Sequence, residues 1–393
     1  MFESYYRNVI FRFLDNIEQG TIILNDDVSK NFGGGEPKVT IEIVSPKFYK
    51  RAGLGGDLGF AESYAKSEWF TDDLTNLITI HILNKDKLSG LDIGWSFLSK
   101  IFARIGHWRR RNTLSGSKRN IQDHYDLSNE MFMTFLDDTM TYSCGYFATE
   151  DDSLYQAQIN KIDEILDKAD INSNDHILEI GSGWGALAKR AVARTGCKVT
   201  TITLSERQCR YVKELIEKES LQDNIDVQLI DFRNIEGAYD KIVSVEMIEA
   251  IGFDLFNSYF SRIESLMKPN GTAVIQAITY PDENYDTYRK GCDFIQKFIF
   301  PGSLLPSVAA MKNSVRLTEM EVEDLERIGP HYATTLSLWN KNFNENIEDI
   351  KELGFDQYFI NLWNYYFSYC EAGFANCTID DVQLVLKGCK ASA

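Results

Sequence analysis

The chain lacks long hydrophobic runs. It has 393 residues, of which 44% are hydrophobic, but it contains no stretch of about 18 consecutive apolar residues that would cross a bilayer. Near the N-terminus, Glu3 and Arg7 interrupt the apolar region that a secretory signal would need. We therefore expect a cytoplasmic protein. At roughly 100–200 residues per domain, the length corresponds to two or three domains, and we take two.

Closely spaced cysteines are absent as well. The seven cysteines are an odd number, lie far apart in the sequence and include no C-x-x-C pair. Disulfide frameworks and structural zinc sites both depend on such spacings. We therefore predict neither a disulfide-stapled fold nor a metal site.

Basic residues are in the minority, with 41 Lys and Arg against 58 Asp and Glu and a net charge of −17. An anionic protein gains little free energy from releasing the counterions of nucleic acid, so we expect no nucleic-acid partner. Residues 103–120 are an exception, with six Arg or Lys and no acid. This segment is either a solvated linker or a surface for anionic lipid. We place the domain boundary there, which gives domains 1–112 and 113–393.

The N-terminal domain is expected to be the smaller one, mainly helical or mixed. Over residues 1–20, apolar side chains recur at helical spacing. This pattern predicts an amphipathic helix whose apolar face either packs in a core or contacts lipid. Residues 39–51 are predicted to form a strand. In the lipid alternative, this domain would bring the protein to a membrane surface.

From residue 155 onwards, short β-branched runs alternate with helix-length stretches. This alternation predicts a doubly wound α/β domain of the Rossmann-like kind, with a parallel sheet covered by helices on both faces. In such folds the ligand sits at the carboxyl ends of the strands. Farther on, residues 358–374 predict an aromatic-rich helix, which we interpret as a lid or a core cover.

The stretch ILEIGSGWGALA leads from an apolar strand through Gly181, Gly183 and Gly185 directly into a helix. Such a loop lets backbone N–H groups approach a nucleotide-like ligand. The glycines would also fit NAD, but NAD-binding folds of this kind carry an acid at the end of the next strand, about 20 residues on. That strand ends instead in Thr203 and Leu204.

Two acids bear on the identity of this ligand. Glu179 lies two residues before the first glycine and completes the acid-x-G-x-G-x-G form typical of S-adenosylmethionine-dependent methyltransferases. Asp231 follows the apolar stretch IDVQLI, where its carboxylate would either accept a hydrogen bond from an adenine amino group or stay solvated. We predict S-adenosylmethionine rather than NAD.

Six motifs occur in the order seen in cyclopropane-fatty-acyl-phospholipid synthases: HYDLSNEMF, MTYSCGYF, LEIGSGWGALA, TLSERQ, EMIEAIG and FIFPGSLLPS. From about residue 120 to its end the chain resembles that family, and the first hundred residues resemble its N-terminal domain less distinctly. The resemblance implies a class I methyltransferase domain with S-adenosylmethionine as the methyl donor, and a homodimer.

Carried over position by position, the resemblance implies two sets of site residues. Those holding S-adenosylmethionine are Tyr142, Ser143, Gly181, Gly183, Thr203, Leu204 and Gln208, to which the loop and strand patterns add Gly185 and Asp231. Those holding a bicarbonate ion beside the reacting methyl group are Cys144 through its backbone, Glu249, Gln276, Ile278 and Tyr332. Many family members have His where this chain has Gln276. An amide can donate to bicarbonate, but it cannot change charge near neutral pH.

The implied activity is methylene transfer to the cis double bond of an unsaturated phospholipid acyl chain, with peripheral contact to the membrane. Attack by an alkene leaves a carbocation that aromatic faces can stabilise. Candidates for this aromatic wall, or for ordinary core residues, are Tyr125, Tyr142, Tyr146 and Phe147. Three alternatives stay open: a related transfer that gives methyl-branched chains, a methyltransferase with a soluble oxygen or nitrogen acceptor, and a noncatalytic lipid-binding protein.

Overall fold

The computed structural model describes residues 2–88 and 128–388. The chain forms two compact units. The first unit comprises Met1–Arg109, Lys290–Pro301 and Leu336–Thr378, and the second comprises the rest. The boundary that we placed near residue 112 lies outside the described residues. A continuous domain over 113–393 differs from this division, because two later segments belong to the first unit.

The first unit contains a four-stranded sheet in the order β2-β1-β3-β4. Its strands are β1 (Gly20–Asn25), β2 (Ser29–Gly34), β3 (Lys38–Ile43) and β4 (Trp69–Thr71). Only β1 and β3 run parallel, while the other two pairings are antiparallel. The strand predicted over residues 39–51 ends early, because Pro46 fixes its own φ and opens a helix at Lys47.

Helices complete this unit. Those from the N-terminal part are α1 (Phe2–Leu14), α2 (Lys47–Ala65), α3 (Leu74–Leu83) and α4 (Lys85–Leu88). The amphipathic helix predicted within residues 1–20 is confirmed as α1, and Ile10 and Leu14 on its apolar stripe are buried. Core packing therefore accounts for these side chains.

The aromatic helix predicted over residues 358–374 is confirmed as α16 (Gln357–Ala375), and it packs against α2 and α3. Its Asn361 donates to the Ser67 hydroxyl (2.9 Å), and Glu371 accepts a hydrogen bond from Thr75 (3.2 Å). The helix thus covers the core of the first unit, which is why residues 336–378 belong there. The same segment includes α15 (Ile347–Glu352) and most of α14 (Gly329–Glu345). Within the described ranges, no helix combines the length and apolarity needed to cross a membrane.

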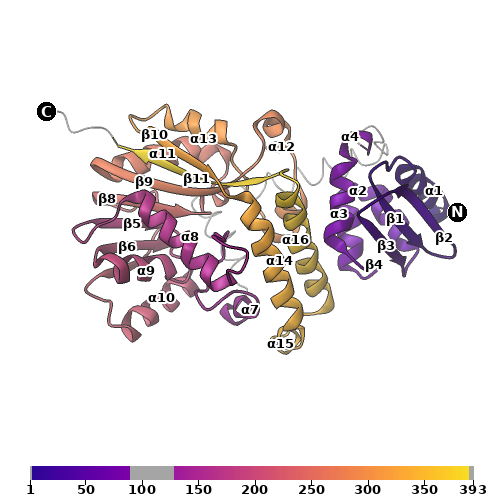
Figure 1. Ribbon diagram of the computed structural model, residues 1–393, viewed down its shortest axis with the longest axis horizontal. Helices are drawn as coiled ribbons and strands as arrows, with labels where there is room; N and C mark the ends of the chain where they lie inside the picture. Colours follow the sequence, from indigo (N-terminus) through magenta and orange to yellow (C-terminus); the bar gives the residue numbers. More distant parts are fainter. Residues whose placement is uncertain (1, 89–127, 389–393) are drawn as a thin grey trace. The chain divides into compact units, whose positions relative to one another are not determined.

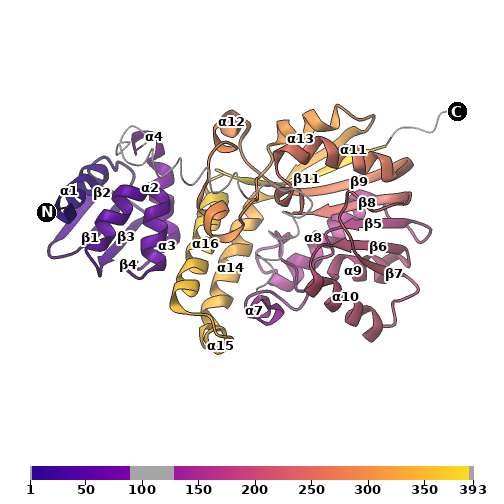
Figure 2. The ribbon, with the colours of Figure 1, turned by 180° about the vertical axis from the view of Figure 1, so that it is seen from behind.

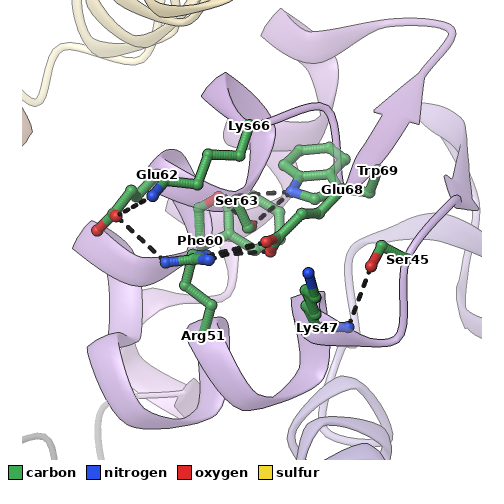
Figure 3. A network of polar contacts seen from close by, with 9 residues as sticks. All are labelled: Ser45, Lys47, Arg51, Phe60, Glu62, Ser63, Lys66, Glu68 and Trp69. Carbon is green, nitrogen blue, oxygen red and sulfur yellow. Dashed lines mark hydrogen bonds and ion pairs between the residues drawn. The ribbon is translucent and has the colours of Figure 1, made fainter. Parts of the chain in front are cut away.

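A polar network joins α2 to β4 in the first unit (Figure 3). The Arg51 guanidinium donates to both oxygens of the buried Glu68 and to Glu62 (3.2 Å). Next to this pair, the indole N–H of the fully buried Trp69 donates to the Ser63 hydroxyl at 2.8 Å. Since buried polar groups are costly without partners, these bonds fix the angle between the helix and the strand.

The second unit is built on a seven-stranded sheet in the order β10-β11-β9-β8-β5-β6-β7. Its strands are β5 (His176–Ile180), β6 (Lys198–Thr203), β7 (Ile225–Leu229), β8 (Tyr239–Val245), β9 (Met267–Thr279), β10 (Glu321–Arg327) and β11 (Asp380–Lys387). All pairings are parallel except those of β11, which is antiparallel to both of its neighbours. This mostly parallel sheet confirms the predicted doubly wound fold.

Helices cover both faces of this sheet (Figures 1 and 2). On one face, α8 (Leu154–Ala169), α9 (Ala186–Thr195) and α10 (Glu206–Lys218) share a core with β5, β6 and β7. On the other face, α11 (Phe256–Leu266) and α13 (Val308–Val315) pack on β8, β9 and β11. Burial on both faces explains why the central strands are almost entirely apolar.

The chain order reverses between β5 and β8, because β6 lies on one side of β5 and β8 on the other. A doubly wound sheet binds its ligand at such a switch point, outside the carboxyl ends of the strands. The loops after β5, β6, β8 and β9 meet at this edge. The short elements near it are α7 (Asn129–Met133), α12 (Tyr285–Tyr288) and the 3-10 turn η1 (Ile248–Ala250).

Candidate active site

The glycine loop after β5 has a backbone that side chains rarely adopt. Gly181, Gly183 and Gly185 all have positive φ, at +101°, +47° and +90°. A Cβ added at Gly183 would meet no atom within 4 Å, whereas one at Gly185 would lie 3.2–3.4 Å from Val212 and Leu215 of α10. Gly183 therefore borders open space for a ligand. Gly185, which we also predicted to bind the cofactor, is needed for the packing of α10 against the start of α9.

Glu179 supplies a second feature that fits S-adenosylmethionine. It is the penultimate residue of β5, two positions before Gly181, and is buried, and within the described residues its Oε2 has no hydrogen-bond partner. Burial raises the pKa of Glu179 to about 8, while contact with the Thr201 hydroxyl and then the charge of Lys161 oppose this shift. A buried carboxyl oxygen left without a donor suits a ligand that brings an ammonium group, as S-adenosylmethionine does, because the cation would favour the ionised form of Glu179.

We predict that Gly183→Ala lowers the affinity for S-adenosylmethionine at least tenfold, because the added methyl group enters the space bordered by the loop. The matched control is Gly196→Ala. Gly196 also has positive φ (+73°) and open space around its Cβ position, but it caps α9 at the opposite edge of the sheet. Both substitutions cost about 1–2 kcal/mol in the left-handed region. Titration calorimetry should show weaker binding for Gly183→Ala alone, and equal affinities for the two variants would contradict the assignment.

The second group of predicted cofactor residues lies after β6. The Thr203 hydroxyl donates to Oε1 of Gln208 (2.9 Å), and the Ser205 hydroxyl accepts the backbone N–H of Gln208 as the N-cap of α10. Leu204 lies between them, half-buried. Asp231, after β7, forms a two-pronged ion pair with Arg233, whose Nε donates to it at 2.7 Å. The adenine contact of Asp231 stays a prediction, and its carboxylate already has a protein partner.

The MTYSCGYF motif lies against the sheet near β8. Cys144 is fully buried, and burial with nearby Asp381 and Glu246 raises the pKa of its thiol well above the usual value. Such a thiol is a poor nucleophile. The Ser143 hydroxyl accepts a hydrogen bond from the buried Lys161 ammonium (2.6 Å). Tyr142 packs edge-on against Phe132 and Phe135.

The centre of the site is a carboxylate that the sequence analysis did not single out. Oε1 of Glu246 accepts the backbone N–H of Cys144 (2.8 Å) and the amide N–H of Gln276 (2.9 Å). Its Oε2 accepts the hydroxyl of Tyr332 (2.6 Å). These donors come from three distant segments and converge on one side chain. The pKa of Glu246 is raised, because burial outweighs the three hydrogen bonds and the charge of Lys161, which lower it.

Glu249 lies three residues farther on, in η1, and accepts the backbone N–H of Ile278 at 2.6 Å. Within the described residues its Oε2 has no hydrogen-bond partner. Burial, and then the charge of Glu246, raise the pKa of Glu249 to about 8. Glu249 is therefore a protonated acid near neutral pH, and it orients the backbone of β9 rather than sharing a ligand with Gln276.

The residues present do not fit the expected bicarbonate ion. Three of its predicted donors, at Cys144, Gln276 and Tyr332, already donate hydrogen bonds to Glu246. The fourth, the N–H of Ile278, ends on Glu249. An anion placed here would also be repelled by the negative charge of Glu246 among buried residues. The structure thus brings three of the five predicted bicarbonate residues together around Glu246, a carboxylate of the protein, and pairs the other two, Glu249 and Ile278, with each other.

A second layer of buried polar residues supports Gln276. Its amide N–H groups reach both Glu246 and Asp381 (2.9 Å each), and its Oε1 accepts from Gln383, the residue opposite it on β11 (3.1 Å). Burial and the charge of Glu246 raise the pKa of Asp381 well above its usual value. Asp381, Gln383 and Lys161 were missed from the sequence, as was Glu246.

The remaining predictions for the site are only partly placed by the structure. Tyr146 stacks at a tilt on His331, with ring centroids 4.6 Å apart, and Phe147 stacks on the same ring at 6.3 Å. Their role as an aromatic wall stays a prediction. Tyr125 and the basic segment 103–120 lie outside the described residues.

Comparison with known proteins agrees with this geometry. The family model described as mycolic acid cyclopropane synthetase matches residues 113–384. The chain belongs to this family. Over 348 residues it is 38% identical to the tuberculostearic acid methyltransferase of Mycobacterium tuberculosis, covering 86% of this chain and 80% of that protein. It is also 34% identical to cyclopropane mycolic acid synthase 1 of the same species, covering 58% of this chain and 82% of the relative.

A solved structure shows the likeness in three dimensions. The crystal structure of a mycolic acid cyclopropane synthase complexed with SAH and CTAB matches with a TM-score of 0.65 and 31% identity, covering 69% of this chain and 98% of that one. The chain is thus an S-adenosylmethionine-dependent methyltransferase of this family, and the predicted class I methyltransferase fold is confirmed.

Proposed function

We propose that this enzyme transfers a methylene group from S-adenosylmethionine to the cis double bond of an unsaturated phospholipid acyl chain. The observation that carries the proposal is the convergence of Cys144, Gln276, Ile278 and Tyr332 on Glu246 and Glu249, two acids that flank Met247, which lies 3.5 Å from the Cβ position of Gly181. The resemblance assigns these four positions to the reacting centre of cyclopropane synthases. Action on a bilayer lipid requires the enzyme to contact the membrane surface peripherally.

When bound, S-adenosylmethionine supplies a methyl group. The π electrons of the alkene form the new bond between this methyl group and one alkene carbon, and the sulfur keeps the electron pair of the broken S–CH₃ bond. The neighbouring carbon is left cationic. The site residues Cys144, Gln276 and Tyr332 are almost fully buried, so water has little access to capture this cation. Loss of a proton from the new methyl group then lets the C–H electron pair close a three-membered ring.

A second candidate is a transfer on the way to methyl-branched chains, whose product here is the exocyclic methylene precursor that a separate reductase would reduce to the branch. The relative with 38% identity over most of this chain is named as a tuberculostearic acid methyltransferase, which favours this alternative. Here a hydride shifts from the methylated carbon to its cationic neighbour before the methyl proton leaves, and the C–H pair forms a C=CH₂ bond. Both products need a base beside the transferred methyl group, so both fit the same site.

The test uses the purified full chain with vesicles of dioleoyl phospholipid and S-adenosylmethionine carrying a CD₃ group. We expect the acyl chains to gain one carbon with two of the three deuterons, because one is removed as a proton equivalent. NMR of the product distinguishes cyclopropane from vinylidene hydrogens. Vesicles of a fully saturated lipid serve as the control. Retention of all three deuterons, or methylation of only a soluble oxygen or nitrogen acceptor, would overturn the proposal.

A further inference from the structure

We infer that the Glu246 carboxylate is the base that removes the proton from the transferred methyl group, in the place where the family resemblance puts bicarbonate. The inference rests on the proposed function and deepens it. It starts from the three hydrogen bonds that Glu246 accepts from Cys144, Gln276 and Tyr332, which are the donors expected to hold the missing ion.

The backbone conformation at Glu246 is one that glutamate rarely adopts. Its φ is +49°, in the left-handed region that favours glycine and that few other residues adopt. Holding a glutamate in this conformation costs free energy, which the surrounding structure must offset. The three hydrogen bonds to its carboxylate provide that compensation, and they exist only because the side chain points into the site.

Glu246 also lies where a methyl donor in the glycine loop would be. It directly follows β8, in which Ser244 pairs with Ile180, the residue before Gly181. The next residue, Met247, lies 3.5 Å from the Cβ position of Gly181. Whereas Gln276 and Asp381 are fully enclosed, Glu246 keeps part of its surface exposed. It is thus the acid of this cluster that a substrate can reach.

The surroundings give Glu246 the features of a base: burial raises its pKa, which strengthens it as a proton acceptor, while its three hydrogen bonds and the charge of Lys161 favour its ionised form. Gln276 cannot turn its amide around, because Gln383 donates to its Oε1 while Asp381 and Glu246 accept from its nitrogen. Burial, and then the charge of Glu246, raise the pKa of the neighbouring Asp381 well above its usual value, which favours its neutral form, and the buried Lys161 lies near both acids. Gln276 and Tyr332 therefore act as donors to a carboxylate.

The step balances without another reactant. The methyl C–H bond breaks, its proton passes to a carboxylate oxygen of Glu246, and its electron pair forms the new C–C bond to the cationic carbon. For the exocyclic product, the same pair forms the second bond of C=CH₂. The carboxylic acid returns its proton to water once the product leaves, which regenerates the base.

Two substitutions separate this role from a structural one. Glu246→Gln keeps the size of the side chain but cannot take a proton, and we expect turnover on dioleoyl vesicles to fall by about 10²–10⁴-fold. Glu246→Gly relieves the backbone and leaves three unused donors around an opening of carboxylate size. We expect added bicarbonate to bind there and to restore part of the lost turnover. Ser220→Gly, at an exposed residue with φ of +57°, controls for the relief of backbone strain.

Calorimetry provides readouts independent of turnover. Bicarbonate should bind saturably to ligand-free Glu246→Gly but not to the parent, and S-adenosylmethionine should bind both variants with near-parental affinity. In buffer depleted of bicarbonate, the parent should keep its full rate. The inference is overturned if the parent needs added bicarbonate or if Glu246→Gln retains parental turnover. If the parent labels no unsaturated chain at all, the proposed function fails instead.

Discussion

Replacing Lys161 by Met is expected to destabilise the protein by about 3–5 kcal/mol near pH 8 and to cost little near pH 5. Lys161 is 1% exposed, and its ammonium donates to Ser143 within a cluster that holds Glu246 and Asp381. Removing this cation leaves a buried negative charge without compensation. The folded variant then holds protons on these acids to higher pH, so its stability falls more steeply with pH than that of the parent.

The cost of the substitution shrinks at the low-pH end of the same experiment. Once the acids are protonated, the parent keeps a buried ammonium with no counter-charge, and burial already lowers the pKa of Lys161. The substitution then removes an unfavourable buried charge and no longer breaks an attractive ion pair. Urea unfolding across this pH range measures the effect, with Lys189→Met as the control, because Lys189 pairs with Glu219 at the surface. Equal losses of stability at pH 5 and pH 8 would show that Lys161 acts through packing alone.

Sequence patterns predicted the second unit better than the first. Periodicity and glycine spacing identified the parallel sheet and the loop at its switch point, because both signals are local. The partner of α16 was not predictable in this way. The bond from Asn361 to Ser67 joins residues 294 positions apart, and nothing in an aromatic helical stripe specifies which core it covers. Because this helix packs in the first unit, residues 336–378 belong to that unit and not to the predicted C-terminal domain.

The central residue of the site was missed for a related reason. The stretch SVEMIEAIG contains two glutamates, and the resemblance pointed to Glu249. Which of them faces the donors depends on the left-handed turn at Glu246, and a glutamate gives no local signal for positive φ. Its position directly after a buried strand, at the edge where ligands bind, was the available clue.

The residues that support Gln276 and Glu246 could not be predicted, because their positions depend on pairing between strands far apart in the sequence. Gln383 faces Gln276 across an antiparallel strand pair that closes a loop of more than a hundred residues. A one-residue shift of this pairing would turn Gln383 to the other face of the sheet. Lys161 is similarly ambiguous, because a lysine in an amphipathic helix predicts a solvated face, whereas here it is enclosed.

Replacing Glu249 by Gln should stabilise the protein relative to the parent, and the gain should grow from pH 5 to about pH 8. Glu249 is expected to take up a proton on folding, since its pKa rises from 4.5 to about 8 in the folded state. Between these values the folded state binds more protons than the unfolded state, so the stability of the parent falls as pH rises. Each unit of this shift corresponds to about 1.4 kcal/mol.

The glutamine variant keeps the structural contact of Glu249 while removing its titration. Its Oε1 can still accept the N–H of Ile278, and it carries no charge at any pH in this range. Thermal unfolding of both proteins from pH 5 to pH 9 gives the difference in stability. Glu214→Gln, on the exposed face of α10, is the control. A difference that does not change with pH would contradict a raised pKa at Glu249.

The same measurement separates the two causes of the shift. Burial is the larger cause, and the negative charge of Glu246 is the second. In a Glu246→Gln background the second cause disappears, so Glu249 should titrate at lower pH and the gain from Glu249→Gln should level off earlier. If it levels off at the same pH in both backgrounds, Glu246 carries no charge in the folded enzyme. Glu246 would then have no carboxylate available to act as a base.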